Sequence, residues 1–247
     1  MPPLNPLLEA PFVKHRIFRM DWLHAADQGI TADFIGNLFY VLVDKFPGDT
    51  IEDQYSAIFN EMDKYYNEFG VDDRMDCMTP GSIRANGSSG MKLRTSAAKC
   101  RKLVPFAYKL ALETCDLSDP VEQALCTAAD HLNQVYGGLT RDCLAADKMM
   151  KDESIKFAVQ YVALHDHFKE LDDRQFRIKP KMHFFLHLCS DGGCPSRAWC
   201  YRDEDFGGSV AKAAHRRGGT LSVQATSMKI LTALKIGTPR ICIRPPQ

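Results

Sequence analysis

The sequence lacks an excess of either charge. Its 247 residues include 31 Lys and Arg and 31 Asp and Glu, so the formal net charge is zero at pH 7. This balance excludes a polybasic chain that binds nucleic acid through its overall charge. The hydrophobic fraction of 45% and the charged fraction of 25% are ordinary globular values, which exclude wholesale disorder and allow a sizeable core.

Long apolar runs and closely paired cysteines are also absent. The longest apolar stretch, residues 34–43, is interrupted by Gly36 and Asn37. Because a membrane helix needs about 20 apolar residues, we expect no membrane partner. The 9 cysteines form no C-x-x-C pair, and the amino terminus has no continuous apolar core of the signal-peptide kind. This pattern predicts reduced thiols in an intracellular compartment.

What is present predicts a mostly α-helical fold with a small β element. Apolar side chains recur about every four positions over residues 24–46, with Thr31 as an N-cap if the helix restarts after Gly29. Residues 50–70 carry a broad apolar face behind the capping-box pair Thr50 and Asp53.

The remaining elements follow from breaker residues. Further helices are expected between residues 93 and 171, with a kink or restart at Pro105 and a new start at Pro120. A short strand is predicted over residues 15–23 and a loop over residues 71–90. The resulting organisation is an extended leader (1–14), a strand and helix (15–48), a helical insertion (49–172), a segment with C-terminal helices (173–235) and a tail (236–247).

Charge is distributed unevenly along the chain. Residues 171–247 hold 13 Lys and Arg against 6 Asp and Glu, and residues 1–170 hold the remaining 18 and 25. A basic C-terminal third can face phosphate groups. Uneven partitioning without any function explains the same numbers equally well.

Two acidic positions have both a metal-binding and a structural interpretation. Asp21 follows a short apolar stretch, where it can bind a metal ion, but it can equally be a helix N-cap with His24 in the first turn. The triplet of Asp203, Glu204 and Asp205 offers oxygen ligands to a hard divalent cation, but it also suits the acidic first turn of a helix.

A third group of residues combines histidine with cysteine. His183 and His187 are four positions apart and share a helix face, a spacing that zinc sites use. Cys189, Cys194 and Cys200 follow, but their spacing matches no zinc finger or knuckle. Packed or hydrogen-bonded histidines are the alternative interpretation.

Three blocks resemble a known group of proteins. They are residues 21–37 (DWLHAADQG followed by ADFIGN), residues 179–183 (KPKMH) and residues 199–208 (WCYRDEDFGG). They are similar to a large group of transposon-derived proteins of unknown activity from protist genomes, over about residues 15–240. More distantly, they resemble ribonuclease H-like transposases of the Kyakuja-Dileera-Zisupton and hAT type.

The resemblance implies a truncated ribonuclease H-like core with a large helical insertion. Asp21 matches the second catalytic acid and Glu204 the third, with Asp203 and Asp205 as rivals for the third position. His24 and His183 would support them, and Mg²⁺ or Mn²⁺ would be the cofactor. The first acid has no match, since Glu9 is the only acidic residue before Asp21 and lies in a proline-rich stretch. We therefore expect a catalytically incomplete remnant of a DNA strand-transfer domain.

The expected function is DNA binding in the nucleus, with phosphate contacts from the basic C-terminal third. The candidate contact residues are Arg197, Arg202, Lys212, Arg216 and Arg217. A homo-oligomer or a missing N-terminal half would complete the site. Two alternatives stay open, a helical protein–protein interaction module without a nucleic-acid role and a small zinc-stabilised domain.

Overall fold

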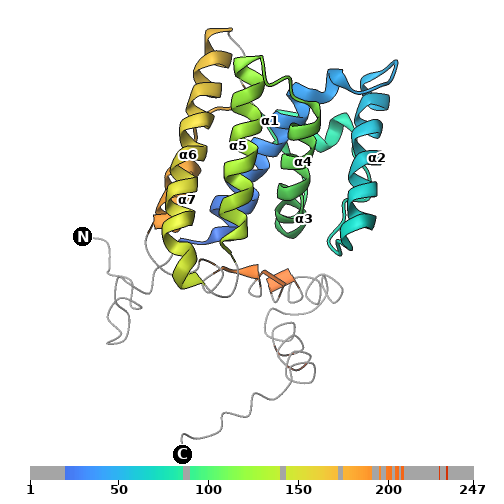
Figure 1. Ribbon diagram of the computed structural model, residues 1–247. Helices are drawn as coiled ribbons and strands as arrows, with labels where there is room; N and C mark the ends of the chain where they lie inside the picture. Colours follow the sequence, from blue (N-terminus) through green and yellow to red (C-terminus); the bar gives the residue numbers. More distant parts are fainter. Residues whose placement is uncertain are drawn as a thin grey trace, which may run out of the picture. The chain divides into compact units, whose positions relative to one another are not determined.

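The computed structural model describes residues 20–85, 90–139, 143–171 and 175–190, and beyond these Pro195, residues 199–201, Glu204, Asp205, Gly207, Gly208, Met228 and Thr232. The chain divides into two compact units, Met1–Trp199 and Cys200–Gln247. The first unit is mostly helical, as predicted, and Figure 1 shows its helices.

The first unit is built around a helix that is covered on nearly every side. A π-helix, Leu23–Thr31, continues into α1, Ala32–Leu42, and a 3₁₀ turn, Val43–Lys45. Every residue from Gly29 to Phe39 is buried. A helix that is apolar all round belongs in the centre of a domain, so this segment forms the axis of the fold.

The other helices surround this axis. They are α2 (Ile51–Phe69), α3 (Ala97–Lys102), α4 (Val104–Thr114), α5 (Pro120–Gly137), α6 (Cys143–Glu170) and α7 (Pro180–Ser190). The α5 and α6 helices lie side by side, α4 packs on α5, and α7 packs on α6 and on the π-helix (Figure 1). Aromatic rings pack between these elements. The ring centroids of Phe34 in α1 and Phe157 in α6 are 5.4 Å apart, and those of Trp22 and Phe185 in α7 are 5.7 Å apart.

Several local signals act as predicted. Thr50 and Asp53 form a reciprocal capping box at the start of α2, and the backbone of Gly70 ends that helix in the left-handed region at φ 60°. The helix around Pro105 restarts between α3 and α4, and Asp119 caps α5 just before Pro120. The axis helix breaks at Gly29, but Thr31 makes no capping bond; its hydroxyl instead lies 2.7 Å from the Tyr136 hydroxyl.

The β element lies elsewhere than predicted. Residues 20–23 form no strand, because Trp22 and Leu23 are already helical; residues 15–19 lie outside the described part. The strands are β1 (Ile83–Ala85) and β2 (Met91–Leu93), an antiparallel pair with Ile83 opposite Leu93. This pair lies at the end of the segment predicted as a loop, because two three-residue strands are too short to show an apolar alternation.

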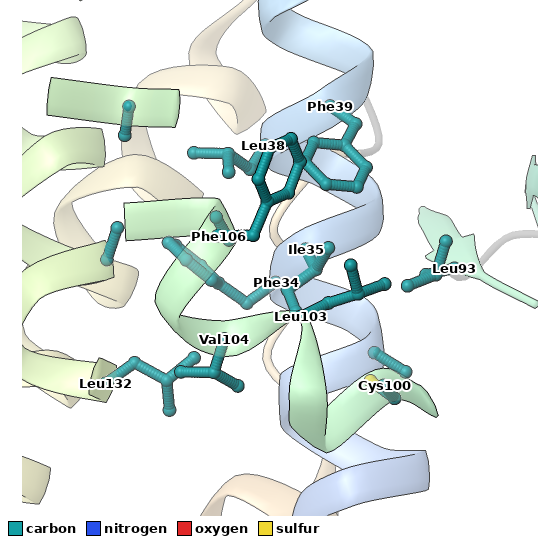
Figure 2. Close-up of a cluster of buried hydrophobic side chains, with 14 of the residues drawn as sticks. Phe34, Ile35, Leu38, Phe39, Leu93, Cys100, Leu103, Val104, Phe106 and Leu132 are labelled. Atoms are coloured by element: carbon teal, nitrogen blue, oxygen red, sulfur yellow. The ribbon is translucent and has the colours of Figure 1, made fainter. Parts of the chain in front are cut away.

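The hairpin is held against α1 by a close approach of backbones. Gly36 lies where a Cβ atom would come within 2.6 Å of the carbonyl carbon of Lys92. Asn37, one residue on, donates to the Met91 carbonyl oxygen at 3.1 Å and accepts from the Phe176 amide at 3.3 Å. Figure 2 shows Ile35 of α1 in the same buried cluster as Leu93 of β2 and Leu103. Through Asn37, α1 is therefore bonded both to β2 and to the segment before α7.

Candidate functional site

Asp21 has the geometry of a helix N-cap. Its carboxylate accepts from the amide of Leu23 at 3.3 Å and from the amide of His24 at 3.1 Å, and one oxygen lies 2.5 Å from His24 Nδ1. The structural interpretation of Asp21 and His24 is therefore confirmed. A metal-binding role in addition stays a prediction, since Asp21 belongs to the first unit and Glu204 to the second, and each unit is described by itself.

The acidic triplet is described only in part. Glu204 and Asp205 are exposed and helical, and the Glu204 amide donates to the Cys200 carbonyl oxygen at 2.9 Å. Asp203 lies outside the described residues, as do the five predicted phosphate contacts Arg197, Arg202, Lys212, Arg216 and Arg217. Their roles stay predictions.

The first unit contains three members of the His/Cys group, whereas Cys194 lies outside the described residues and Cys200 belongs to the second unit. On α7, His183 and His187 are exposed with their Nε2 atoms 3.1 Å apart. Cys189 instead faces the core, and burial raises the pKa of its thiol to about 12, although a hydrogen bond with Ser154 lowers it. Cys189 is buried whereas both histidines are exposed on α7, so the thiol lies on another face of the helix from the histidine pair.

The structure reveals a lysine cluster that the sequence interpretation missed. Lys92 of β2 donates to the Gln28 carbonyl oxygen at 2.6 Å, and Lys181 of α7 donates to the same oxygen at 3.5 Å. The break at Gly29 makes this possible, because a Cβ atom there would come within 2.9 Å of the Lys181 side chain. A small residue at the break thus opens a path for a cationic side chain from a distant helix.

A buried carboxylate lies beneath the lysine cluster. Asp33 is 2% exposed, and one of its oxygens lies 2.8 Å from Lys179 Nζ. Its other oxygen is buried and has no hydrogen-bond partner in the described part of the chain. Burial raises the pKa of Asp33, although Lys179, Lys92 and Lys181 all act to lower it. One carboxyl group therefore faces three lysines, which leaves an excess of positive charge.

Two cavities that share lining residues lie along β2 and the start of α3, and Lys92 lines the first of them. The first has a volume of about 320 Å³ and is lined by Gln28, Ala32, Lys92, Leu93, Arg94 and Thr95. The second, of about 330 Å³, is lined by Met75, Asp76, Cys77, Ser82, Arg94, Thr95, Ser96 and Lys99. Arg94 and Thr95 line both cavities, and we call the two cavities together the basic groove.

A signal for the basic groove was present in the sequence. From Met91 to Lys109 the chain has six Lys and Arg and no Asp or Glu. This basic stretch is not apparent when charge is counted over residues 1–170 as a whole, because that region has more acidic than basic residues. The approach of Lys179 and Lys181 to it depends on the tertiary fold, so the complete cluster had no local signature.

Another polar cluster, deeper in the fold, is structural. Asp27 is fully buried and accepts from Trp22 Nε1 at 3.1 Å and from the Tyr136 hydroxyl at 2.6 Å. Burial, and then the Asp27 carboxyl, raise the pKa of Tyr136 well above its usual value, so the hydroxyl keeps its proton and donates. The bond between Asp27 and Tyr136 joins the π-helix to α5 and so holds the helix that carries Gln28 in place.

Comparison with known proteins does not add to this description: no family model, curated protein or solved structure matches the chain. The likeness to transposases therefore stays a prediction. In the described part of the chain, no helix combines the length and apolarity needed to cross a membrane. The site is thus defined by its own geometry, as a basic groove on a helical domain.

Proposed function

We propose that this protein binds DNA and that the basic groove contacts the phosphate backbone. The observation that carries the proposal is the row of Lys92, Arg94 and Lys99 along β2 and the start of α3, which lines two cavities that share Arg94 and Thr95. Among the described residues that line them, Asp76 alone is acidic, and it pairs with Lys99 at 3.2 Å. Cations arranged along a groove track a polyanionic strand better than scattered surface charges do.

The distribution of charge along the chain supports the same proposal. Lys181, which bonds the Gln28 carbonyl oxygen, and Lys179, which pairs with Asp33, belong to the basic C-terminal third with its 13 Lys and Arg. In the proposal, Arg197, Arg202, Lys212, Arg216 and Arg217 extend this surface. Each neutralised phosphate releases counterions, so affinity must fall steeply as salt rises.

The test is the salt dependence of binding to duplex and single-stranded DNA. We expect Lys92→Met and Lys99→Met each to weaken binding and to reduce the slope of log K against log salt by about 0.7–0.9 per lost phosphate contact. Lys64→Met is the matched control, since Lys64 is exposed on α2 and pairs with Glu61 outside the groove. Absence of binding at low salt, or equal slopes for all three variants, would contradict the proposal.

The transposase origin adds a metal-dependent step to the proposal. Asp21 and Glu204 would bind Mg²⁺ or Mn²⁺ and serve strand cleavage. Asp21→Asn is a suitable variant because asparagine also caps helices, so the helix start is preserved. If Mg²⁺- or Mn²⁺-dependent nicking is found, we expect Asp21→Asn and Glu204→Gln to abolish it, and nicking retained in both variants would reject these ligands.

A second candidate function is self-association through α6. Ile155, Val159 and Val162 are exposed at the i, i+4 and i+7 positions of one face, and such a stripe favours a helix partner. Sedimentation of the wild type and of Val159→Asp separates the two candidates. Self-association that Val159→Asp abolishes, without any DNA binding, would favour the interaction module.

A further inference from the structure

We propose that the cavity lined by Gln28, Lys92 and Arg94 binds a single phosphomonoester group, supplied by the end of a nucleic-acid strand or by a free nucleotide. The inference rests on the proposed function in one respect, that phosphate is the ligand of the basic groove. It goes further in assigning a compact dianion, rather than a backbone phosphodiester, to one end of that groove.

The first argument is the convergence of donors. Lys92 and Lys181 come from β2 and α7, yet both bond the Gln28 carbonyl oxygen, at 2.6 and 3.5 Å. One ammonium group is enough to satisfy that oxygen. Each lysine has three N–H donors, so most of their hydrogen-bonding capacity remains for a ligand. Arg94 lines the same cavity, is exposed, and adds a planar donor suited to phosphate.

The second argument is uncompensated charge. Asp33 is paired with Lys179 at 2.8 Å, so this carboxyl group is already engaged. Burial, together with the nearby charges of Lys92 and Lys179, lowers the pKa of Lys181. Like charges held together at a half-buried position destabilise the empty site, and an anion relieves that repulsion.

The third argument concerns the charge of the ligand. Lys92 and Arg94 line the cavity, Lys181 bonds the carbonyl oxygen of Gln28, which also lines it, and Asp33 pairs with Lys179. A phosphomonoester carries about −1.5 to −2 charges at neutral pH and three acceptor oxygens. A phosphodiester carries one charge and two free oxygens, so it leaves more of this cluster unpaired. The cavity volume of about 320 Å³ accommodates such a group.

The structure also explains how the site is built. Gly29 leaves room for the Lys181 side chain, and Gly36 lets β2 approach α1 closely enough to bring Lys92 over the Gln28 carbonyl oxygen. Two glycines of one helix thus position lysines from two other elements. A purely structural role for the lysines predicts that their loss destabilises the fold, and a binding role predicts that it removes phosphate affinity.

The experiment measures binding of inorganic phosphate, adenosine monophosphate, and two oligonucleotides that differ only in a 5′-phosphate or 5′-hydroxyl end, all at constant ionic strength. We expect saturable binding of inorganic phosphate to the full chain. Lys181→Met and Lys92→Met should each weaken it about tenfold or more, the loss of one charge-assisted hydrogen bond. Lys181→Arg should retain most of the affinity, and Lys64→Met should change nothing.

Urea denaturation of the same variants separates binding from folding. Reduced phosphate affinity with an unchanged unfolding midpoint supports the proposal. Phosphate binding that is not saturable, or that all variants retain equally, overturns it. A preference for the 5′-phosphate oligonucleotide over the 5′-hydroxyl one assigns the group to a strand end, and tighter binding of the free nucleotide assigns it to a small molecule.

Failure of this inference can be told from failure of the proposed function. DNA binding that depends on Lys99 and on salt, without any saturable phosphate site, retains the function and rejects the pocket. Saturable, Lys181-dependent phosphate binding without DNA binding retains the pocket and rejects the function.

Discussion

At the scale of single residues, Gly36 decides how closely the hairpin lies against the central helix. A glycine inside a helix costs about 0.5–1 kcal/mol relative to alanine, so its presence in α1 needs a compensating contact. That contact is the backbone of β2, which occupies the space where a Cβ atom would lie. The same approach places Lys92 over Gln28.

We expect Gly36→Ala to lower the free energy of unfolding by about 1–3 kcal/mol, because the new methyl group overpacks the α1–β2 contact. Urea denaturation measures this change. Gly137→Ala is the control, since in the described part of the chain no atom outside the adjoining turns of its own helix lies within 4 Å of a Cβ at that position. It should leave stability unchanged or raised. Equal effects at the two positions would show that the close approach to β2 is not what requires Gly36.

At the scale of helices and strands, α5 and α6 are joined by a partly buried ionic contact. Glu153 of α6 lies 2.6 Å from His131 Nδ1 of α5 and 2.7 Å from Lys156 Nζ. Burial raises the pKa of Glu153, but the hydrogen bonds from Lys156 and His131 outweigh it and hold the pKa below 4.5. The folded state therefore favours the ionised carboxylate.

The sign of the pH effect follows from this depressed pKa. The unfolded chain binds the proton more readily, so the contact stabilises the fold above about pH 4.5 and is lost as the pH falls through the folded pKa. Glu153→Gln should lower the free energy of unfolding by about 1–3 kcal/mol at neutral pH. The difference from the wild type should shrink in acid. Urea denaturation across pH checks this, and a pH-independent difference would contradict it.

A second prediction at this scale concerns the exposed histidine pair of α7. Zinc binds imidazole nitrogen at about 2.0–2.1 Å, so one ion can contact both Nε2 atoms at their separation of 3.1 Å. We expect the untagged protein to be retained on a zinc- or nickel-chelate column, and His183→Ala or His187→Ala to reduce retention. His167→Ala should not reduce it, because His165 and His167 are two positions apart and do not share a helix face. Equal retention of all variants would exclude this pair.

At the scale of the whole molecule, the buried thiols report on the intact core. Cys100 of α3 and Cys189 of α7 are buried, and burial raises the pKa of both thiols, that of Cys189 to about 12. Only the thiolate reacts readily with alkylating reagents. Cys77, by contrast, is exposed.

We therefore expect iodoacetamide to modify Cys77 in the folded protein, and Cys100 and Cys189 only at urea concentrations that unfold it. Mass spectrometry of peptides containing these residues measures the three rates separately. Raising the pH to mildly alkaline values should accelerate the two buried thiols little, because they stay protonated. Rapid labelling of Cys100 in the native protein would contradict the packing of α3 against the central helix.

The sequence predicted those features that depend on neighbours along the chain. The capping box of Thr50 and Asp53, the start of α5 at Pro120 and the break at Gly29 each act within a few residues, so local sequence reveals them. For Asp21 the sequence allowed both a metal ligand and a helix N-cap, and the N-cap is confirmed. It failed at the hairpin, because β1 and β2 gain their stability from α1 rather than from an alternation of their own.

The sequence by itself thus determined a helical chain, the starts of α2 and α5, and the cationic stretch after Met91. Only the tertiary structure decided which charges meet. Lys92 and Lys181 lie far from Gln28 and Asp33 along the chain. They meet because two glycines let a strand and a distant helix approach the same turn. Electrostatic interactions depend on distance in space, and folding alone sets that distance.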